Sequence, residues 1–107
     1  MSLVAIVLAA GLLVAANGPM LVATNAQGSR LEIYDEPGPA CQGQAKRSVF
    51  QFGPAGDRKG ERVEGCYIVI APTDKTPGGV AIVDIEGDVY KVPLEVFKSP
   101  IDAPGNT

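Results

Sequence analysis

The chain has 107 residues, 46% of them apolar, with two Cys, no His and a net charge of −3. This length allows a single domain and excludes a large α/β scaffold, while the absence of His excludes Ser–His and Cys–His catalytic pairs and most metal sites. The mildly acidic balance, with both signs interspersed, lacks the basic stripe of an ordinary nucleic-acid binder, so we expect no nucleic-acid partner.

The apolar residues are concentrated at the N-terminus. Residues 1–26 hold 19 of the 49 apolar residues and no charged residue, and residues 3–16 carry no polar side chain. A run of this length is typical of the hydrophobic region of a signal peptide, and short side chains allow cleavage before Asn17 or before Gln27. We therefore expect residues 1–26 to be a signal peptide or an N-terminal membrane anchor.

Two interpretations other than cleavage stay open for this segment. An uncleaved anchor from residue 3 to residue 23 is long enough to span a bilayer, with Asn17-Gly18-Pro19 near its outer end. The other is a β-hairpin, because Asn-Gly between two apolar runs is a strong signal for a type I′ turn. A membrane partner is expected only if residues 1–26 are retained.

Five segments after residue 26 have the pattern of short strands, separated by turns rich in Gly and Pro. They are residues 30–34, 48–52, 62–71, 80–85 and 88–94. The second half of residues 62–71 is continuously apolar, which favours a central strand covered on both faces. The pattern as a whole predicts an all-β fold, a small meander or open barrel of about five short strands.

The last two segments form the most clearly predicted hairpin. Glu86-Gly87 separates them, and glycine supplies the positive φ of a tight turn. Lys91 and Pro93 mark the final segment as an edge strand or a strand end, because proline cannot donate to a ladder. Residues 95–98 are expected to form one helical turn, and residues 100–107 a polar tail.

Cys41 and Cys66 are the only cysteines, and both lie in the polar part of the chain. In an oxidising compartment they suit one disulfide. Closing a loop of about 25 residues would stabilise the fold by roughly 3 kcal/mol in the chain-entropy model. Two buried free thiols in a reducing compartment are the alternative.

Three carboxylates are the main candidates for chemistry. Asp84, Glu86 and Asp88 are spaced two apart around one turn and so project to one side. Such a cluster could hold a calcium ion or supply a carboxylate pair, but the loop lacks the ligand count of a calcium site. The spacing therefore favours solvating charges at a hairpin tip, and we expect no catalytic residue, no metal and no cofactor.

The aromatic residues are the candidates for a contact surface. The chain has six of them, Tyr34, Tyr67, Tyr90, Phe50, Phe52 and Phe97. Four of the six are expected in the core. Those that project outward would form the contact patch of a binding module, and the three tyrosines are the candidates for it.

Three short motifs in the second half of the chain form a spaced pattern. They are Gly65-Cys66-Tyr67, Glu86-Gly87-Asp88, and Pro93-Leu94 followed by Phe97. The pattern resembles that of small exported proteins of proteobacteria and their phages, in which Trp is commoner than Tyr in the first motif and Asp is commoner than Glu in the second. The resemblance implies export, a β-fold and a disulfide from Cys66 to an upstream partner, here Cys41, and it implies no activity.

The end of the predicted sheet is also similar to a known architecture. Tyr90 to Pro93, followed by Phe97, resembles the closing strand and turn of bacterial SH3-like barrels, although the aromatic residue falls one position later than usual. The likeness is an analogy of architecture and implies no function.

These observations predict a small exported β domain at residues 27–99, in the periplasm or cell envelope, that binds a protein partner without catalysis. The alternative is a structural or accessory subunit of a membrane complex or a phage virion that retains its hydrophobic N-terminus. The fate of residues 1–26 separates the two, since a retained apolar segment must be buried against a partner.

Overall fold

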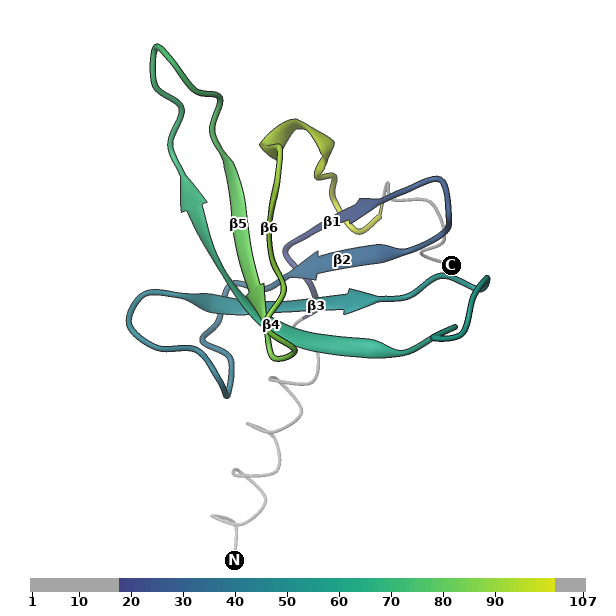
Figure 1. The fold of residues 1–107 in the computed structure, drawn as a ribbon. Helices are drawn as coiled ribbons and strands as arrows, with labels where there is room; N and C mark the ends of the chain where they lie inside the picture. The colour runs from purple at the N-terminus through teal and green to yellow at the C-terminus, as the bar shows by residue number, and fades with distance from the viewer. Residues whose placement is uncertain (1–17, 102–107) are drawn as a thin grey trace, which may run out of the picture.

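The computed structural model describes residues 18–101, so the predictions made for residues 1–17 and 102–107 lie outside the described part of the chain. Six antiparallel strands follow one another in sequence order and form one curled sheet, a half-barrel (Figure 1). The elements are β1 (Leu21–Thr24), β2 (Arg30–Ile33), β3 (Lys46–Gln51), β4 (Arg62–Ile70), β5 (Gly79–Asp84), β6 (Val89–Val92) and a short 3-10 helix, η1 (Leu94–Val96). The prediction of an all-β meander is confirmed.

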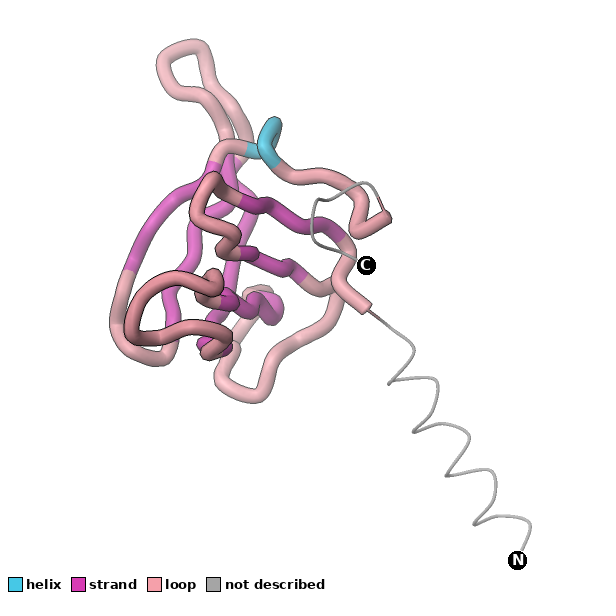
Figure 2. The backbone as a smooth tube through the Cα atoms, turned by 90° about the vertical axis from the view of Figure 1, so that its right-hand side faces the viewer, coloured by secondary structure: helices cyan, strands magenta, loops and turns pink. Residues whose placement is uncertain are grey.

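The curl of the sheet is centred on β4, the longest strand. Residues 62–67 of β4 pair with β3, and residues 65–70 pair with β5. Gly65 lies where both neighbours meet, and a Cβ there would come within 2.9 Å of the Ser48 Oγ and of the Val83 carbonyl oxygen. The missing side chain thus lets β3 and β5 approach each other at Gly65. Figure 2 shows the curled arrangement of the strands from the side.

The segment after η1 returns to the first strand. Lys98 forms an isolated antiparallel bridge with Val22, with backbone N–H···O distances of 2.9 and 2.8 Å in the two directions. This bridge covers part of the β1 edge, whereas within residues 18–101 no strand pairs with the outer edge of β6. The half-barrel therefore has an open seam beside β6.

The interior is filled by alternate side chains of the strands, because successive residues of a strand point to opposite faces. The buried cluster comprises Ala23, Leu31, Ile33, Tyr67, Val80 and Ile82. Partly buried side chains pack against it, namely Leu21, Phe50, Tyr90, Val92 and Phe97. The core is thus small, and several of its aromatic members keep part of their surface in solvent.

The outer face of the sheet is polar over β2, β3 and β4. Glu32 is buried there, with 6% of its surface exposed. It accepts hydrogen bonds from Arg30 at 2.9 Å, Tyr34 at 2.8 Å and Arg62 at 2.8 Å. These donors satisfy a carboxylate that would otherwise be costly to bury.

Toward β5 and β6 the same outer face becomes apolar. Ile68, Val83, Ile85 and Val89 are each at least half exposed, and Val89 is 73% exposed. The β4–β5 and β5–β6 registers place these side chains on one side of the sheet. They are named the outer apolar patch below.

Cys41 and Cys66 form a disulfide, with a sequence separation of 25 residues. The bond ties the loop between β2 and β3 to the outer face of β4. The pairing expected from the sequence is confirmed.

β1 lies inside the first 26 residues, which the sequence pattern assigns to a signal peptide or an anchor. Val22 is 1% exposed, and β1 pairs with β2 along its whole length. Cleavage before Gln27 would therefore remove a strand of the sheet, whereas cleavage before Asn17 would leave the sheet whole. β1 coincides with the second arm of the alternative hairpin, whose first arm lies outside the described residues. Among residues 18–101 no helix has the length and apolar character needed to cross a membrane.

The second half of β4 is not covered on both faces, so that prediction is wrong. Ile68, Val69 and Ile70 are all exposed. β3 pairs with β4 only as far as Tyr67, and the β4–β5 hairpin continues beyond the sheet as an arm (Figure 1). A continuous apolar run is thus compatible with a strand that keeps one neighbour and lies in solvent.

Candidate functional site

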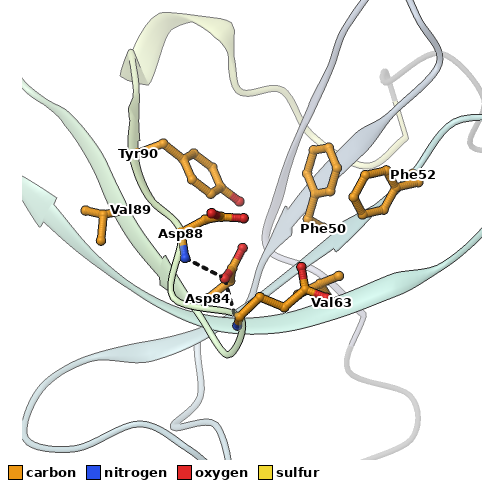
Figure 3. Close-up of a pocket in the computed structure, with 8 residues that line it drawn as sticks. Phe50, Phe52, Val63, Asp84, Asp88, Val89 and Tyr90 are labelled. Atoms are coloured by element: carbon orange, nitrogen blue, oxygen red, sulfur yellow. Dashed lines mark hydrogen bonds between the residues drawn. The ribbon is translucent and has the colours of Figure 1, made fainter. Parts of the chain in front are cut away.

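A pocket lies on the inner side of the half-barrel, between β3 and the β5–β6 hairpin. Its volume is about 460 Å³, within the size range of small-ligand sites. Aromatic side chains form one wall and carboxylates another (Figure 3). The lining residues are Phe50, Phe52, Val63, Asp84, Glu86, Asp88, Val89 and Tyr90. This site is named the aromatic–acidic pocket.

Strand alternation positions the aromatic rings. Phe50 faces the interior because it pairs in register with the buried residues Leu31 and Val63. Phe52, two residues later, keeps the same side, and its ring meets that of Phe50 edge to face with centroids 5.0 Å apart. Tyr90 of β6 lies across the pocket, with its hydroxyl directed into the space between the walls (Figure 3).

The acidic wall is built by the β5–β6 hairpin. The Asp84 N–H donates to the Asp88 carbonyl at 3.0 Å, and Gly87 has a φ of 93°, which glycine adopts without strain. The Oδ1 atom of Asp84 accepts hydrogen bonds from the N–H groups of Glu86 at 2.9 Å and Asp88 at 3.0 Å. The positive φ predicted for this glycine is confirmed, and the turn is ordered by its own first aspartate.

Arg58 neutralises one member of the acidic wall. Its guanidinium donates to the two carboxylate oxygens of Glu86 at 2.9 and 2.5 Å and also to Glu61. The same guanidinium lies over the Phe52 ring, 4.4 Å from the centroid. The hydrogen bond from Arg58 lowers the pKa of Glu86. The rim of the pocket therefore already holds a guanidinium between a carboxylate and an aromatic ring.

Asp84 and Asp88 have no such cation. Within residues 18–101 no Lys or Arg nitrogen lies within 4.0 Å of either carboxylate. Burial raises the pKa of Tyr90 to about 12, and the charges of Asp84 and Asp88 act in the same direction. A positive group in this pocket would meet two negative charges and the faces of aromatic rings together.

The structure places the three candidate tyrosines differently. Tyr34 and Tyr67 are 7% and 4% exposed, so burial removes both from the candidate contact surface. Their hydroxyls are used internally, since Tyr67 donates to the Tyr34 carbonyl and Tyr34 donates to Glu32. Tyr90 lines the aromatic–acidic pocket and keeps its place as a candidate contact residue.

The three carboxylates come together as their spacing predicts. Ligand atoms of Asp84, Glu86 and Asp88 lie within 4.8 Å of one another. Glu86 is held by Arg58, and one oxygen of Asp84 is held by two backbone N–H groups. These contacts favour the interpretation of the cluster as charges at a hairpin tip.

No pattern in the sequence indicates the role of Arg58. Arg58 and Glu86 are 28 residues apart, and they meet because the β3–β4 loop reaches the β5–β6 hairpin. The alternation of Phe50 and Phe52 indicates part of the pocket, since it places two aromatic rings on a single strand face. No local pattern connects that face with the hairpin that completes the pocket.

The fold and the pocket define a small, disulfide-linked all-β half-barrel with an aromatic–acidic pocket on its inner side. Comparison of the chain with protein-family models, with curated proteins and with solved structures gave no match. The resemblance to exported proteins of proteobacteria and their phages, and the analogy with SH3-like barrels, therefore stay predictions.

Proposed function

We propose that this protein is a non-catalytic binding module and that the aromatic–acidic pocket is its binding site for a positively charged group. One observation carries the proposal. Asp84 and Asp88, which have no cation partner among residues 18–101, lie across a single pocket from Phe50 and Phe52. Tyr90 stands beside the two aspartates and completes the aromatic surface.

Carboxylates and aromatic rings both attract cations, by different routes. The face of a ring is negative through its quadrupole, and a carboxylate acts through its full charge, which is screened less in a partly enclosed site. At the rim of the pocket the guanidinium of Arg58 contacts both Phe52 and Glu86, so a cation is already held there by a ring and a carboxylate together. A neutral group gains neither attraction, and an anion is repelled by the aspartates.

The test compares two ligands of nearly the same shape, N-acetyl-argininamide, which is a cation, and N-acetyl-citrullinamide, which is neutral. Binding to the isotope-labelled full chain is followed by NMR. We expect the arginine derivative to shift the amide resonances of residues 84–90. It should bind roughly tenfold more tightly than the citrulline derivative, a ratio equivalent to about 1.4 kcal/mol.

The matched variants remove charge without removing the turn. In the double variant Asp84→Asn, Asp88→Asn, asparagine retains the side-chain oxygen that accepts the turn hydrogen bonds. This variant is expected to lose most of its preference for the cation and to keep only the part that the aromatic rings supply. Asp74 is an exposed carboxylate in the β4–β5 loop, away from the pocket. The control variant Asp74→Asn should keep the preference for the arginine derivative. Equal binding of both ligands by the native chain would overturn the proposal.

The proposed setting of this module is the periplasm or cell envelope. The Cys41–Cys66 disulfide supports an oxidising compartment, and residues 3–16 have the composition of a signal-peptide core. Intact mass of the protein from its native cell fraction tests the setting. We expect a species that begins at Asn17 and is alkylated only after reduction. Alkylation of both cysteines without prior reduction would contradict the proposed oxidising compartment.

A structural subunit of a membrane complex or a virion is the second candidate function, and the outer apolar patch favours it. Contiguous aliphatic side chains in water mark surfaces that a partner covers. If the patch is such a surface, the full chain should sediment as an oligomer and Val83→Asp as a monomer. Ile101→Asp is the matched control outside the patch, since Ile101 is also exposed. A native chain that sediments as a monomer counts against this function.

A further inference from the structure

The aromatic–acidic pocket is one end of a longer groove. A second pocket of about 390 Å³ adjoins it and shares Phe50 and Tyr90 with it. The second pocket is mostly apolar, with Ala23 and Leu31 on one side and Val92 on the other. The groove therefore follows the open seam of the half-barrel, acidic beside the β5–β6 hairpin and apolar beside β1 and η1.

β6 presents a free backbone edge at this seam. The Asp84 N–H bonds to the Asp88 carbonyl, and in an antiparallel ladder hydrogen-bonded pairs alternate with pairs that are not bonded. By this alternation the N–H and C=O groups of Val89 and Lys91 point away from β5. Within residues 18–101 no strand pairs with them. An extended segment beside β6 would hydrogen-bond to these groups.

The side chains of such a segment would alternate between the groove and the outer face. Groove-facing positions are two residues apart, or about 7 Å along the strand. When one of them lies beside Tyr90, which lines both pockets, the next lies beside Val92, and a long basic side chain at the first position is within reach of the neighbouring Asp88. The first position suits a basic side chain and the second an apolar one.

Residues 1–17 and 102–107 include no Lys and no Arg. Neither stretch can therefore supply the basic side chain that complements the acidic end of the groove, which favours a segment of another molecule as the occupant.

Resting on the proposed function, the geometry points to the partner as an extended peptide segment of another protein, which adds as a strand to the edge of β6. Its Lys or Arg enters the aromatic–acidic pocket, and an apolar side chain two residues away enters the adjoining apolar pocket. The backbone of the segment supplies affinity through the β6 edge, and the two side chains supply selectivity.

The experiment uses the full chain and the peptide acetyl-Leu-Thr-Lys-Thr-Leu-amide, followed by NMR. The peptide carries Leu two residues to either side of Lys, so it fits the groove in either chain direction. Thr at the remaining positions favours an extended conformation. We expect it to shift the amide resonances of Val89 and Lys91. The same peptide with Glu in place of Lys should bind roughly tenfold more weakly.

Two further peptides test the backbone pairing, one N-methylated at both Thr amides and the other at the Lys amide. Only alternate amides of a strand face its neighbour, so one of these peptides should lose binding and the other keep it. Equal binding of both at the parent affinity would overturn strand addition. Shifts confined to Ile68, Val83 and Ile85 of the outer apolar patch, with none at Val89 and Lys91, would overturn the groove as the site.

N-acetyl-argininamide separates the failure of this inference from the failure of the proposed function. If this small cation binds in the aromatic–acidic pocket and the parent peptide does not bind, the peptide inference fails and the proposed function stands. If neither binds, both fail.

Discussion

The Tyr67 hydroxyl donates a 2.8 Å hydrogen bond to the backbone carbonyl of Tyr34, across 33 residues of sequence. The Tyr34 hydroxyl in turn donates to the Glu32 carboxylate at 2.8 Å. Burial raises the pKa of both tyrosines, which keeps the two phenols protonated as donors. The chain of bonds connects the interior of the half-barrel with the ion-pair network on its outer face.

Tyr67→Phe tests the first of these bonds. The substitution keeps the ring and leaves the buried Tyr34 carbonyl without its donor, so the free energy of unfolding should fall by about 1–2 kcal/mol. Urea denaturation followed by circular dichroism measures the change. Tyr90→Phe is the matched control and should change stability by less than about 0.5 kcal/mol, since Tyr90 is only partly buried. Equal losses in the two variants would contradict a specific role for the Tyr67 hydroxyl.

Glu32 makes folding stability depend on pH in the acid range. Burial by itself would raise the pKa of Glu32, but hydrogen bonds from two arginines and Tyr34 outweigh it and hold the pKa below 4.5. The folded chain thus binds this proton less tightly than the unfolded chain does. The ionised carboxylate therefore stabilises the fold above a pH of about 4.5, and this contribution is lost as the pH falls through the lowered pKa.

Glu32→Gln is expected to lower the free energy of unfolding by about 2 kcal/mol near neutral pH, because charge-assisted hydrogen bonds are lost. The difference from the native chain should shrink as the solution is made acid. Glu95→Gln, at η1, is the control and should leave the pH profile unchanged. Urea denaturation at a series of pH values measures the free energy of unfolding of both variants. If the difference between the native chain and Glu32→Gln stays constant with pH, the linkage to Glu32 is contradicted.

The alternating part of the fold could be predicted from the sequence. Leu31 and Ile33 alternate with charged residues, and Phe50 and Phe52 share one face, so short-range pattern locates β2 and β3. Gly87 locates the last hairpin because its positive φ is a local requirement. These features depend on neighbouring residues alone, which is why local pattern is sufficient to find them.

The strand β1, the exposed β4–β5 arm and the aromatic–acidic pocket could not be predicted from local pattern, because they depend on how the strands pair and pack in the folded chain. β1 lacks alternation and follows a longer apolar run, so its sequence is equally compatible with a leader. Val69 and Val80 share a face, yet Val80 is buried and Val69 is exposed, because the β4–β5 arm extends past β3. The aromatic–acidic pocket likewise needs a loop from β3–β4 to meet the β5–β6 hairpin. The pairing of β1 with β2, the length by which β4 passes β3 and the approach of the loop to the hairpin are features of the folded sheet, and no local pattern encodes them.

The position of β1 predicts how truncation affects folding. A chain that begins at Asn17 keeps β1 and should unfold cooperatively. A chain that begins at Gln27 loses the buried side chains of Val22 and Ala23 and the partner of Lys98. A buried Val contributes roughly 1.5–3 kcal/mol, and the whole β1–β2 ladder is lost with it, so this shorter chain should be largely unfolded. Thermal denaturation of the two chains measures the difference, and equal midpoints would show that β1 is dispensable to the sheet.

Tyr90 reports on the electrostatics of the aromatic–acidic pocket. Burial, and then the charges of Asp84 and Asp88, raise the pKa of its phenol from 10.0 to about 12. The folded chain therefore holds this proton more tightly than the unfolded chain. The resulting stabilisation is complete below the ordinary pKa of 10.0 and is lost as the pH rises toward about 12.

The double variant Asp84→Asn, Asp88→Asn should move the pKa of Tyr90 part of the way back, because burial is the larger cause and is retained. Ultraviolet absorbance of tyrosinate against pH measures the shift, and Tyr90→Phe assigns the transition. Asp74→Asn should leave the pKa of Tyr90 unchanged. A Tyr90 pKa near its ordinary value in the native chain would mean that the aspartate charges do not extend over the pocket, and the electrostatic basis for binding a cation there would be lost.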